Sequence, residues 1–112
     1  MFFSGPALAE EDSELAEVYY QAGLSLLKQN SFGPATEKFE RALTYNSNFP
    51  KAVFKLGECY EKMNERQKAV IYYRRCVKMF WKKTALAKEE EEMLNQALRN
   101  LDKLDVKSSF LH

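Results

Sequence analysis

A spacing of 34 residues recurs along this chain. Gly23 and Gly57 are 34 residues apart, and other positions at the same interval match in size or polarity. The further pairs are Tyr19 with Val53, Tyr20 with Phe54, Asn30 with Asn64, Ala35 with Ala69, Phe39 with Tyr73, Ala42 with Cys76 and Leu43 with Val77. Self-similarity at a fixed interval of this length is the signature of a repeat architecture. The stretch from Val18 to Met79 is therefore predicted to be a duplicated helical hairpin.

Apolar residues at helical spacing predict two helices in each half of the repeat. The first helix is expected to begin near Ser13, because the acidic residues around it suit a helix N-terminus. The second is expected to start around Pro34, where a missing N–H costs nothing, and to end near Tyr45. The second half predicts helices over about residues 51–63 and 67–80.

The small residues of the repeat have a packing role. Gly23 and Gly57 are expected to let the first helix of each pair approach the second, with Ala35 and Ala69 as the small surfaces opposite. A larger side chain at either glycine would overpack the hairpin and cost about 1–3 kcal/mol.

These residues resemble the tetratricopeptide repeat family, in which a bulky residue, a Leu-Gly pair and a Tyr precede a small, an aromatic and a second small residue. The second half of the repeat carries this pattern as Val53, Leu56, Gly57, Tyr60, Ala69, Tyr73 and Cys76. The first half carries it as Tyr19, Ala22, Gly23, Leu26, Ala35, Phe39 and Ala42. The resemblance implies an all-α fold of antiparallel helical hairpins stacked as a short right-handed solenoid. Repeat one would span about residues 16–49 and repeat two about residues 50–83.

The remaining residues predict a tail and a cap. Residues 1–12 contain a Gly-Pro pair and are expected to be a flexible N-terminal tail. A capping helix is expected over about residues 84–105, where leucines form one apolar stripe without the Leu-Gly pair of a third repeat. The folded domain would then span residues 13–106, and residues 107–112 would form a frayed C-terminus.

Few residues suit catalysis. His112 is the only histidine, it lies at the C-terminus, and the chain has no Gly-rich phosphate loop. Cys59 and Cys76 fall on apolar helix positions and are expected to be reduced and buried. Their spacing does not form a zinc-binding pattern. The sequence therefore predicts a protein that is not an enzyme and that holds neither a cofactor nor a metal ion.

The resemblance places a partner-binding groove on the first helix of each repeat. In this family a peptide or helix of a partner protein lies in a concave groove, so the chain is expected to be an interaction module or adaptor. The groove residues assigned in this way are Tyr20, Leu24, Leu27, Lys28, Phe54, Lys55, Glu58 and Lys62. The apolar residues among them are predicted to form an exposed line, which is typical of an interaction surface.

The distribution of charge indicates an alternative binding surface. The formal net charge is +1, but residues 51–88 carry eleven basic and three acidic residues, whereas residues 1–50 carry three basic and seven acidic residues. Within residues 66–83 the basic residues interleave with aromatic residues, a combination that binds nucleic acid or an acidic protein. The basic residues assigned to this surface are Arg74, Arg75, Lys78, Lys82 and Lys83. Of the two partners we favour the acidic protein.

Three further expectations concern what covers these surfaces. The chain's own tail, through Phe2, Phe3 or Leu8, is an alternative occupant of the apolar line. Trp81 is expected to seal the junction with the capping helix rather than to contact a partner. The last of the three is a homodimer that forms through the capping helix.

The sequence also predicts a compartment. No apolar run approaches the roughly 20 residues that a membrane span needs. The chain is therefore expected to be cytoplasmic, unless an N-terminal export signal has been removed from it.

Overall fold

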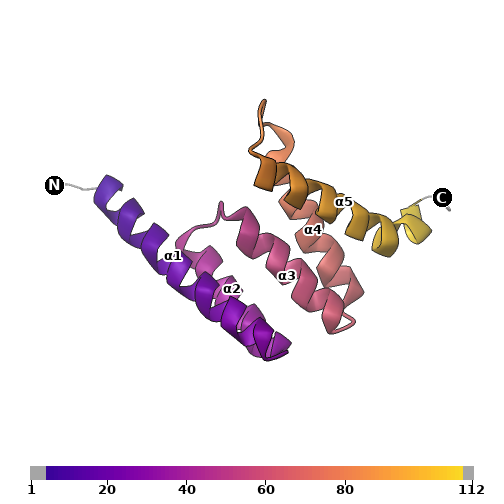
Figure 1. Ribbon diagram of the computed structural model, residues 1–112, viewed down its shortest axis with the longest axis horizontal. Coiled ribbons are helices and arrows are strands. Elements are labelled where there is room, and N and C mark those ends of the chain that lie inside the picture. The colour runs from indigo at the N-terminus through magenta and orange to yellow at the C-terminus, as the bar shows by residue number, and fades with distance from the viewer. Residues whose placement is uncertain (1–4, 110–112) are drawn as a thin grey trace.

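The protein is a linear stack of α-helices. The computed structural model describes the backbone of residues 5–109 and the side chains of residues 10–104. The helices in this range are α1 (Gly5–Lys28), α2 (Phe32–Tyr45), α3 (Pro50–Lys62), α4 (Arg66–Trp81) and α5 (Lys88–Ser109), and no strand occurs among them. α1 and α2 form one antiparallel hairpin, α3 and α4 form a second, and α5 lies at the far end of the stack from α1 (Figure 1). The predicted all-α fold of stacked hairpins is confirmed.

Each hairpin turns through an asparagine in the left-handed region of backbone space. Asn30 has a φ of 59° and Asn64 has a φ of 62°, a conformation that asparagine adopts more readily than most residues. In the first turn the Ser31 amide donates a hydrogen bond to the Leu26 carbonyl at 2.9 Å, and the equivalent bond closes the second turn at 2.8 Å. The repeated asparagine of the sequence therefore specifies a repeated turn.

A glycine and an aromatic ring face each other inside each hairpin. A Cβ atom built on Gly23 would lie 2.6 Å from Cε1 of Phe39, and one built on Gly57 would lie 2.7 Å from Cε1 of Tyr73. Both separations are well inside van der Waals contact, so only glycine fits against the ring. The predicted close approach of the helices is confirmed, but the nearest atoms belong to the aromatic rings rather than to the alanines of the repeat.

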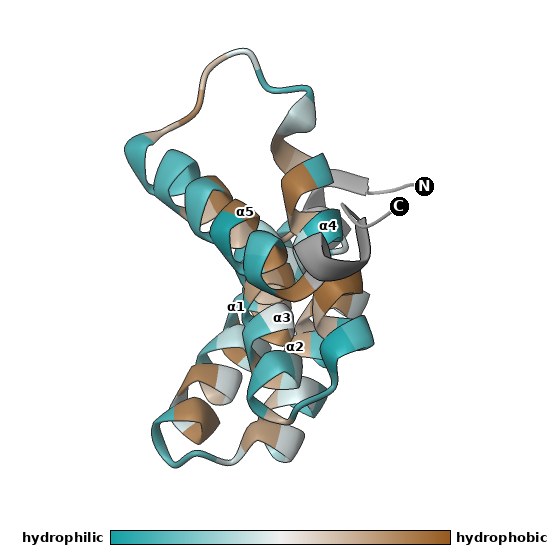
Figure 2. Cartoon of the chain, turned by 90° about the vertical axis from the view of Figure 1, so that its right-hand side faces the viewer, coloured by the Kyte–Doolittle hydropathy of each residue, from teal (hydrophilic) through white to brown (hydrophobic). Residues whose placement is uncertain are grey.

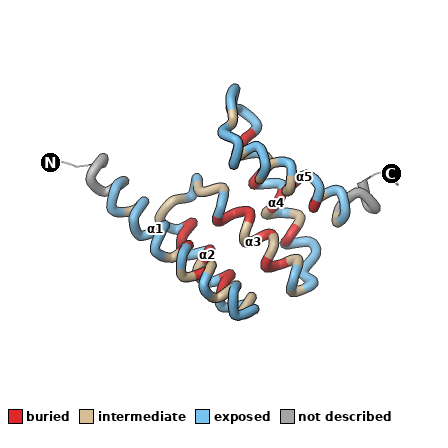
Figure 3. Tube along the Cα trace, in the orientation of Figure 1, coloured by how far each residue is buried: buried red, intermediate tan, exposed pale blue. Residues whose placement is uncertain are grey.

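The core runs through the middle of the stack. α2, α3 and α4 contribute most of its buried residues, whereas the described N-terminal part of α1 is exposed (Figure 3). The largest fully buried side chains are Tyr73, Phe39, Leu56, Val53, Cys59 and Cys76. Full burial of a large apolar side chain contributes roughly 1.5–3 kcal/mol, so these residues hold the two hairpins together.

The N-terminal helix is longer than the sequence predicts. α1 begins at Gly5, eight residues before the predicted start near Ser13, and residues 5–12 of the predicted tail are therefore helical. Proline is tolerated in the first turn of a helix, because its missing N–H has no intrahelical partner there. Pro6 therefore does not prevent the earlier start. Residues 1–4 lie outside the described residues.

The predicted capping helix corresponds to α5. It begins at Lys88 rather than near residue 84, and it continues to Ser109. Residues 82–87 connect it to α4. Residues 107–109, predicted to be frayed, are thus helical, and residues 110–112 lie outside the described residues. α5 packs against α4 much as α3 packs against α2, with Ala97 and Asn100 buried. No helix within residues 5–109 combines the length and apolar character needed to cross a membrane.

Candidate functional site

The predicted groove residues Tyr20 and Phe54 are part of the core. Each is only 7% exposed, so the prediction that they form an exposed apolar line is wrong. The Tyr20 ring lies 5.1 Å from the ring of Phe49, between α2 and α3, and 5.7 Å from the ring of Phe39. Phe54 lies 5.7 Å from the ring of Tyr73. These aromatic contacts hold both rings in the core of the stack.

The other predicted groove residues are at least partly exposed. Leu24 and Leu27 of α1 are half-buried and pack against the core, while Lys28 and Lys62 are exposed at the C-terminal ends of α1 and α3. The leucines therefore retain part of their surface for contact with another molecule. The proposal that the N-terminal tail covers them involves side chains outside the described residues.

Lys55 and Glu58 form an ion pair on α3. The Lys55 ammonium donates a hydrogen bond to the Glu58 carboxylate at 3.1 Å, and both side chains are about one third exposed, at 30% and 35%. Burial raises the pKa of the Tyr20 hydroxyl, and the carboxylates of Glu17 and Glu58 raise it further. The Glu58 carboxylate of α3 is thus near enough to the Tyr20 hydroxyl of α1 to disfavour its ionisation. The faces of α1 and α3 that carry these two residues are therefore near each other, although the closely packed partners of α1 and α3 are α2 and α4.

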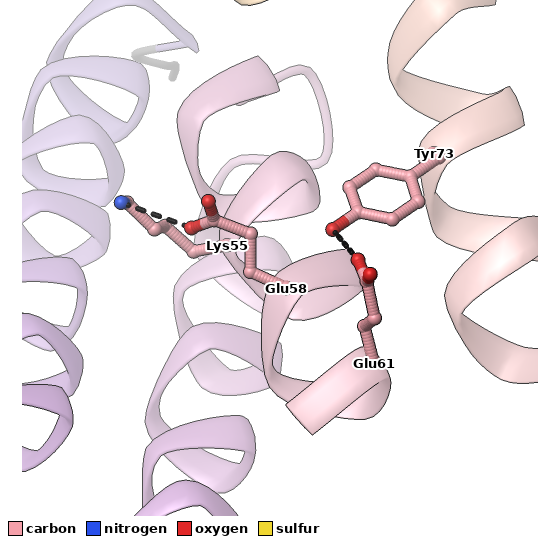
Figure 4. A network of polar contacts seen from close by, with 4 residues as sticks. All are labelled: Lys55, Glu58, Glu61 and Tyr73. Atoms are coloured by element: carbon pink, nitrogen blue, oxygen red, sulfur yellow. Dashed lines mark hydrogen bonds and ion pairs between the residues drawn. The ribbon is translucent and has the colours of Figure 1, made fainter. Parts of the chain in front are cut away.

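A second carboxylate on α3 has a different role. Glu61 turns toward α4, where it accepts a hydrogen bond from the Tyr73 hydroxyl at 2.8 Å, whereas Lys55 and Glu58 point away from α4 (Figure 4). Burial and the hydrogen bond to Glu61 raise the pKa of Tyr73. Glu61 therefore stabilises the hairpin, and the carboxylate left on the open surface is Glu58.

The predicted basic surface divides into two parts. All five of its basic residues are exposed, but only Arg74, Lys78 and Lys82 line a common pocket. The other two interact elsewhere: Arg75 lies over the Tyr72 ring, 6.0 Å from its centroid, and Lys83 forms an ion pair with Glu90 of α5. The hydrogen bond from Lys83 lowers the pKa of Glu90, and one from the Ala87 amide lowers it further.

The pocket between α4 and α5 was not predicted. It is open to solvent, has a volume of about 520 Å³, and adds Val77, Trp81 and Leu101 to the basic residues. Trp81 is 79% exposed, so the prediction that it seals the junction with the capping helix is wrong. The spacing of Arg74, Lys78, Trp81 and Lys82 on one face of α4 could have revealed the pocket, but its opposite wall depends on where α5 packs.

The two cysteines are chemically inert in the folded protein. Cys59 and Cys76 are free and buried, as the sequence predicts, and burial raises the pKa of each thiol to about 12. Because the thiolate is the reactive form, neither cysteine is a nucleophile near neutral pH. Among the described side chains no group of three or more His, Cys, Asp or Glu residues is placed to hold a metal ion.

These features define a helical-repeat protein whose exposed surfaces are suited to contacts with other macromolecules. Residues 51–80, which cover nearly all of α3 and α4, match the family model of the tetratricopeptide repeat. These residues therefore form a tetratricopeptide repeat, as the resemblance of the motifs in the second half of the chain's repeat predicts. Repeats of this family generally mediate protein–protein interaction. No curated protein matches the chain.

Proposed function

We propose that this protein is a non-enzymatic interaction module, or adaptor, that binds a peptide or helix of a partner protein on the adjoining faces of α1 and α3. The observation that supports the proposal is that α1 and α3, whose aromatic residues Tyr20 and Phe54 are buried, offer two kinds of contact. Leu24 and Leu27 provide half-exposed apolar contact on α1, and the Lys55–Glu58 pair provides charge on α3.

The buried aromatic residues contribute indirectly to binding. Tyr20 and Phe54 are held by neighbouring rings, so the helices α1 and α3 that carry the binding side chains are packed in place before a partner arrives. A surface that is already ordered loses less conformational entropy on binding. The partner segment is expected to be apolar where it meets the α1 leucines and polar where it meets the α3 ion pair.

Peptides selected from a random display library can test this surface. The selection is made on the wild-type protein, and the dissociation constants of the selected peptides are measured by fluorescence anisotropy. Leu24→Asp and Lys55→Glu are each expected to weaken the selected peptides by about tenfold or more, a loss of about 1.4 kcal/mol. Ile71→Asp, at an exposed apolar position of α4, is the matched control for the aspartate substitution.

Circular dichroism of every variant establishes that the fold is retained. Lys55→Glu changes a side chain that is only partly buried, so it tests the surface even if Leu24→Asp lowers stability. Affinities that are unchanged in both folded variants, or reduced equally by Ile71→Asp, would show that the partner does not bind on α1 and α3.

A further inference from the structure

The pocket between α4 and α5 is an open apolar groove with a basic edge. Its apolar part is formed by Val77, Trp81 and Leu101, and the aliphatic stems of Lys78 and Lys82 extend along it. Figure 2 looks onto this end of the stack, where hydrophobic and hydrophilic turns alternate along α4 and α5. A tryptophan that is 79% exposed beside two other apolar residues is a feature of interfaces rather than of free surface.

α5 lacks the second helix that the other hairpins have. α1 is paired with α2 and α3 with α4, whereas α5 packs mainly against α4 among the described residues. One row of α5, which includes Ala97 and Asn100, is buried on α4, while the adjacent row continues through Leu94, Leu98 and Leu101. Leu98 is 46% exposed. The groove is thus bounded by two helices, and its open side is the position where a third helix would pack.

The charges at the groove select for an acidic occupant. Lys78 and Lys82 are exposed, and neither forms an ion pair with another described residue. Opposite charges across an interface favour association, whereas like charges in contact cost several kcal/mol. The groove therefore fits a helix that carries both carboxylates and apolar side chains on one face.

The N-terminal part of α1 has this chemistry. Glu11, Leu15 and Val18 follow one another at helical spacing, with Glu14 beside them. Leu15 is 40% exposed and Val18 is 60% exposed, and both glutamates are exposed. Figure 3 shows this part of the helix extending beyond the buried core. One face of α1 therefore presents acidic and apolar groups together.

We propose that the N-terminal part of α1 of one copy docks in the α4–α5 groove of a second copy. α1 and the groove lie at opposite ends of the stack (Figure 1), so they meet only between molecules. Leu15 and Val18 cover Trp81 and Leu101, and Glu11 and Glu14 face the lysines. The two surfaces are different, so the contact is head-to-tail and builds an open chain of copies, or a ring where the rotation between copies closes.

Sedimentation velocity of the full chain tests the proposal with two charge-reversal variants. The wild-type protein is expected to sediment faster as its concentration rises, and less so at about 0.5 M than at about 0.05 M salt, because salt screens the exposed charges. Lys78→Glu with Lys82→Glu reverses the charge of the groove, and Glu11→Lys with Glu14→Lys reverses the charge of α1. Each double variant is expected to weaken self-association at least about tenfold.

An equimolar mixture of the two double variants restores opposite charges at both contacts and is expected to restore association. Lys62→Glu with Arg66→Glu, two exposed residues beside the α3–α4 turn and at the other end of α4 from Lys78 and Lys82, applies the same change of charge and is the matched control. Recovery in the mixture cannot arise from unfolding of either variant.

Three results would overturn the proposal. The first is a wild-type chain that remains monomeric at all concentrations and both salt concentrations. The second is association that the double variants leave unchanged or that the mixture fails to restore. The third is a monomeric chain that binds a labelled single-stranded RNA through Lys78 and Lys82, since the groove would then be a nucleic-acid surface.

Discussion

Replacement of Gly57 by alanine tests the packing of the second hairpin. The added Cβ atom would lie 2.7 Å from Cε1 and 2.8 Å from Cδ1 of Tyr73. The Tyr73 ring cannot easily move aside, because it is fully buried and lies 5.7 Å from the Phe54 ring. Its hydroxyl also donates a hydrogen bond to the Glu61 carboxylate at 2.8 Å. The helices of the hairpin must therefore separate, or the hydrogen bond must lengthen.

Two opposing contributions set the change in the free energy of unfolding that Gly57→Ala causes. Alanine favours a helix interior over glycine by about 1 kcal/mol. Overpacking of a well-ordered core costs typically about 1–3 kcal/mol. We expect the cost to lie near the upper limit, because both the ring and its hydroxyl are fixed, and the net destabilisation of Gly57→Ala to be about 1–2 kcal/mol.

Gly33 provides a matched control on α2. Beyond its chain neighbours, a Cβ atom at Gly33 would meet nothing within 4 Å, so Gly33→Ala makes the same substitution without a ring contact. Alanine favours a helix over glycine, but Pro34 disfavours the helical conformation of a preceding residue that has a Cβ, so the net change in stability is expected to stay below about 1 kcal/mol. Urea unfolding followed by far-UV circular dichroism measures both variants. Gly57→Ala is thus expected to destabilise the protein more than the identical substitution at Gly33.

A double-mutant cycle attributes the loss to the ring. Tyr73→Leu should destabilise the wild-type protein but should cost less in the Gly57→Ala background, because the smaller side chain relieves the overlap. If Gly57→Ala is as stable as the wild type, or if the cycle is additive, the contact between the glycine and the ring does not limit packing as we argue.

Three other properties can be predicted from the structure. Because burial raises the pKa of Cys59 and Cys76 from 9.0 to about 12, iodoacetamide should label the folded protein near pH 8 about a thousandfold more slowly than the urea-unfolded chain; equal rates would contradict their burial. The raised pKa of Tyr73 means that the folded protein keeps a proton above pH 10 that the unfolded chain loses, so stability should fall as pH rises above 10, by up to about 1.4 kcal/mol per pH unit from this group. Tyr73→Phe should reduce this slope in urea titrations, and an unchanged slope would exclude Tyr73 as its source. Leu98→Lys should change the free energy of unfolding by no more than about 0.5 kcal/mol, because the side chain lies on an open surface; a loss above about 2 kcal/mol would place it in the core.

The hairpins could be predicted from the sequence because their determinants are local and repeated. The glycine and the aromatic residue of each hairpin recur at the same interval, and so does the asparagine of each turn. Helical spacing then gives the inner face of each helix. The helix ends were predicted least well. The Gly-Pro pair does not break α1, which begins at Gly5, because proline is tolerated in the first turn of a helix.

The exposure of individual side chains could not be predicted in the same way. The Tyr20 ring packs on Phe39 of its own hairpin and also on Phe49, which follows α2 in the chain and whose ring lies 5.1 Å away. Trp81 is exposed because α5 begins only at Lys88 and does not pack over it. Leu101 reaches the groove through the same packing. Each outcome depends on a contact between elements, which helical spacing within one element does not contain.

The closest packing among the described residues is between consecutive helices, so local unfolding of one helix exposes only its neighbours in the stack. α1 packs on α2, α2 on α3, α3 on α4 and α4 on α5. In such an array, unfolding begins at an end and proceeds inward one neighbour at a time. Amide hydrogen exchange should therefore be slowest in α3 and fastest toward both outer helices. A partner held against α1 and α3 would slow opening from the α1 side, while α5 could still detach and reattach.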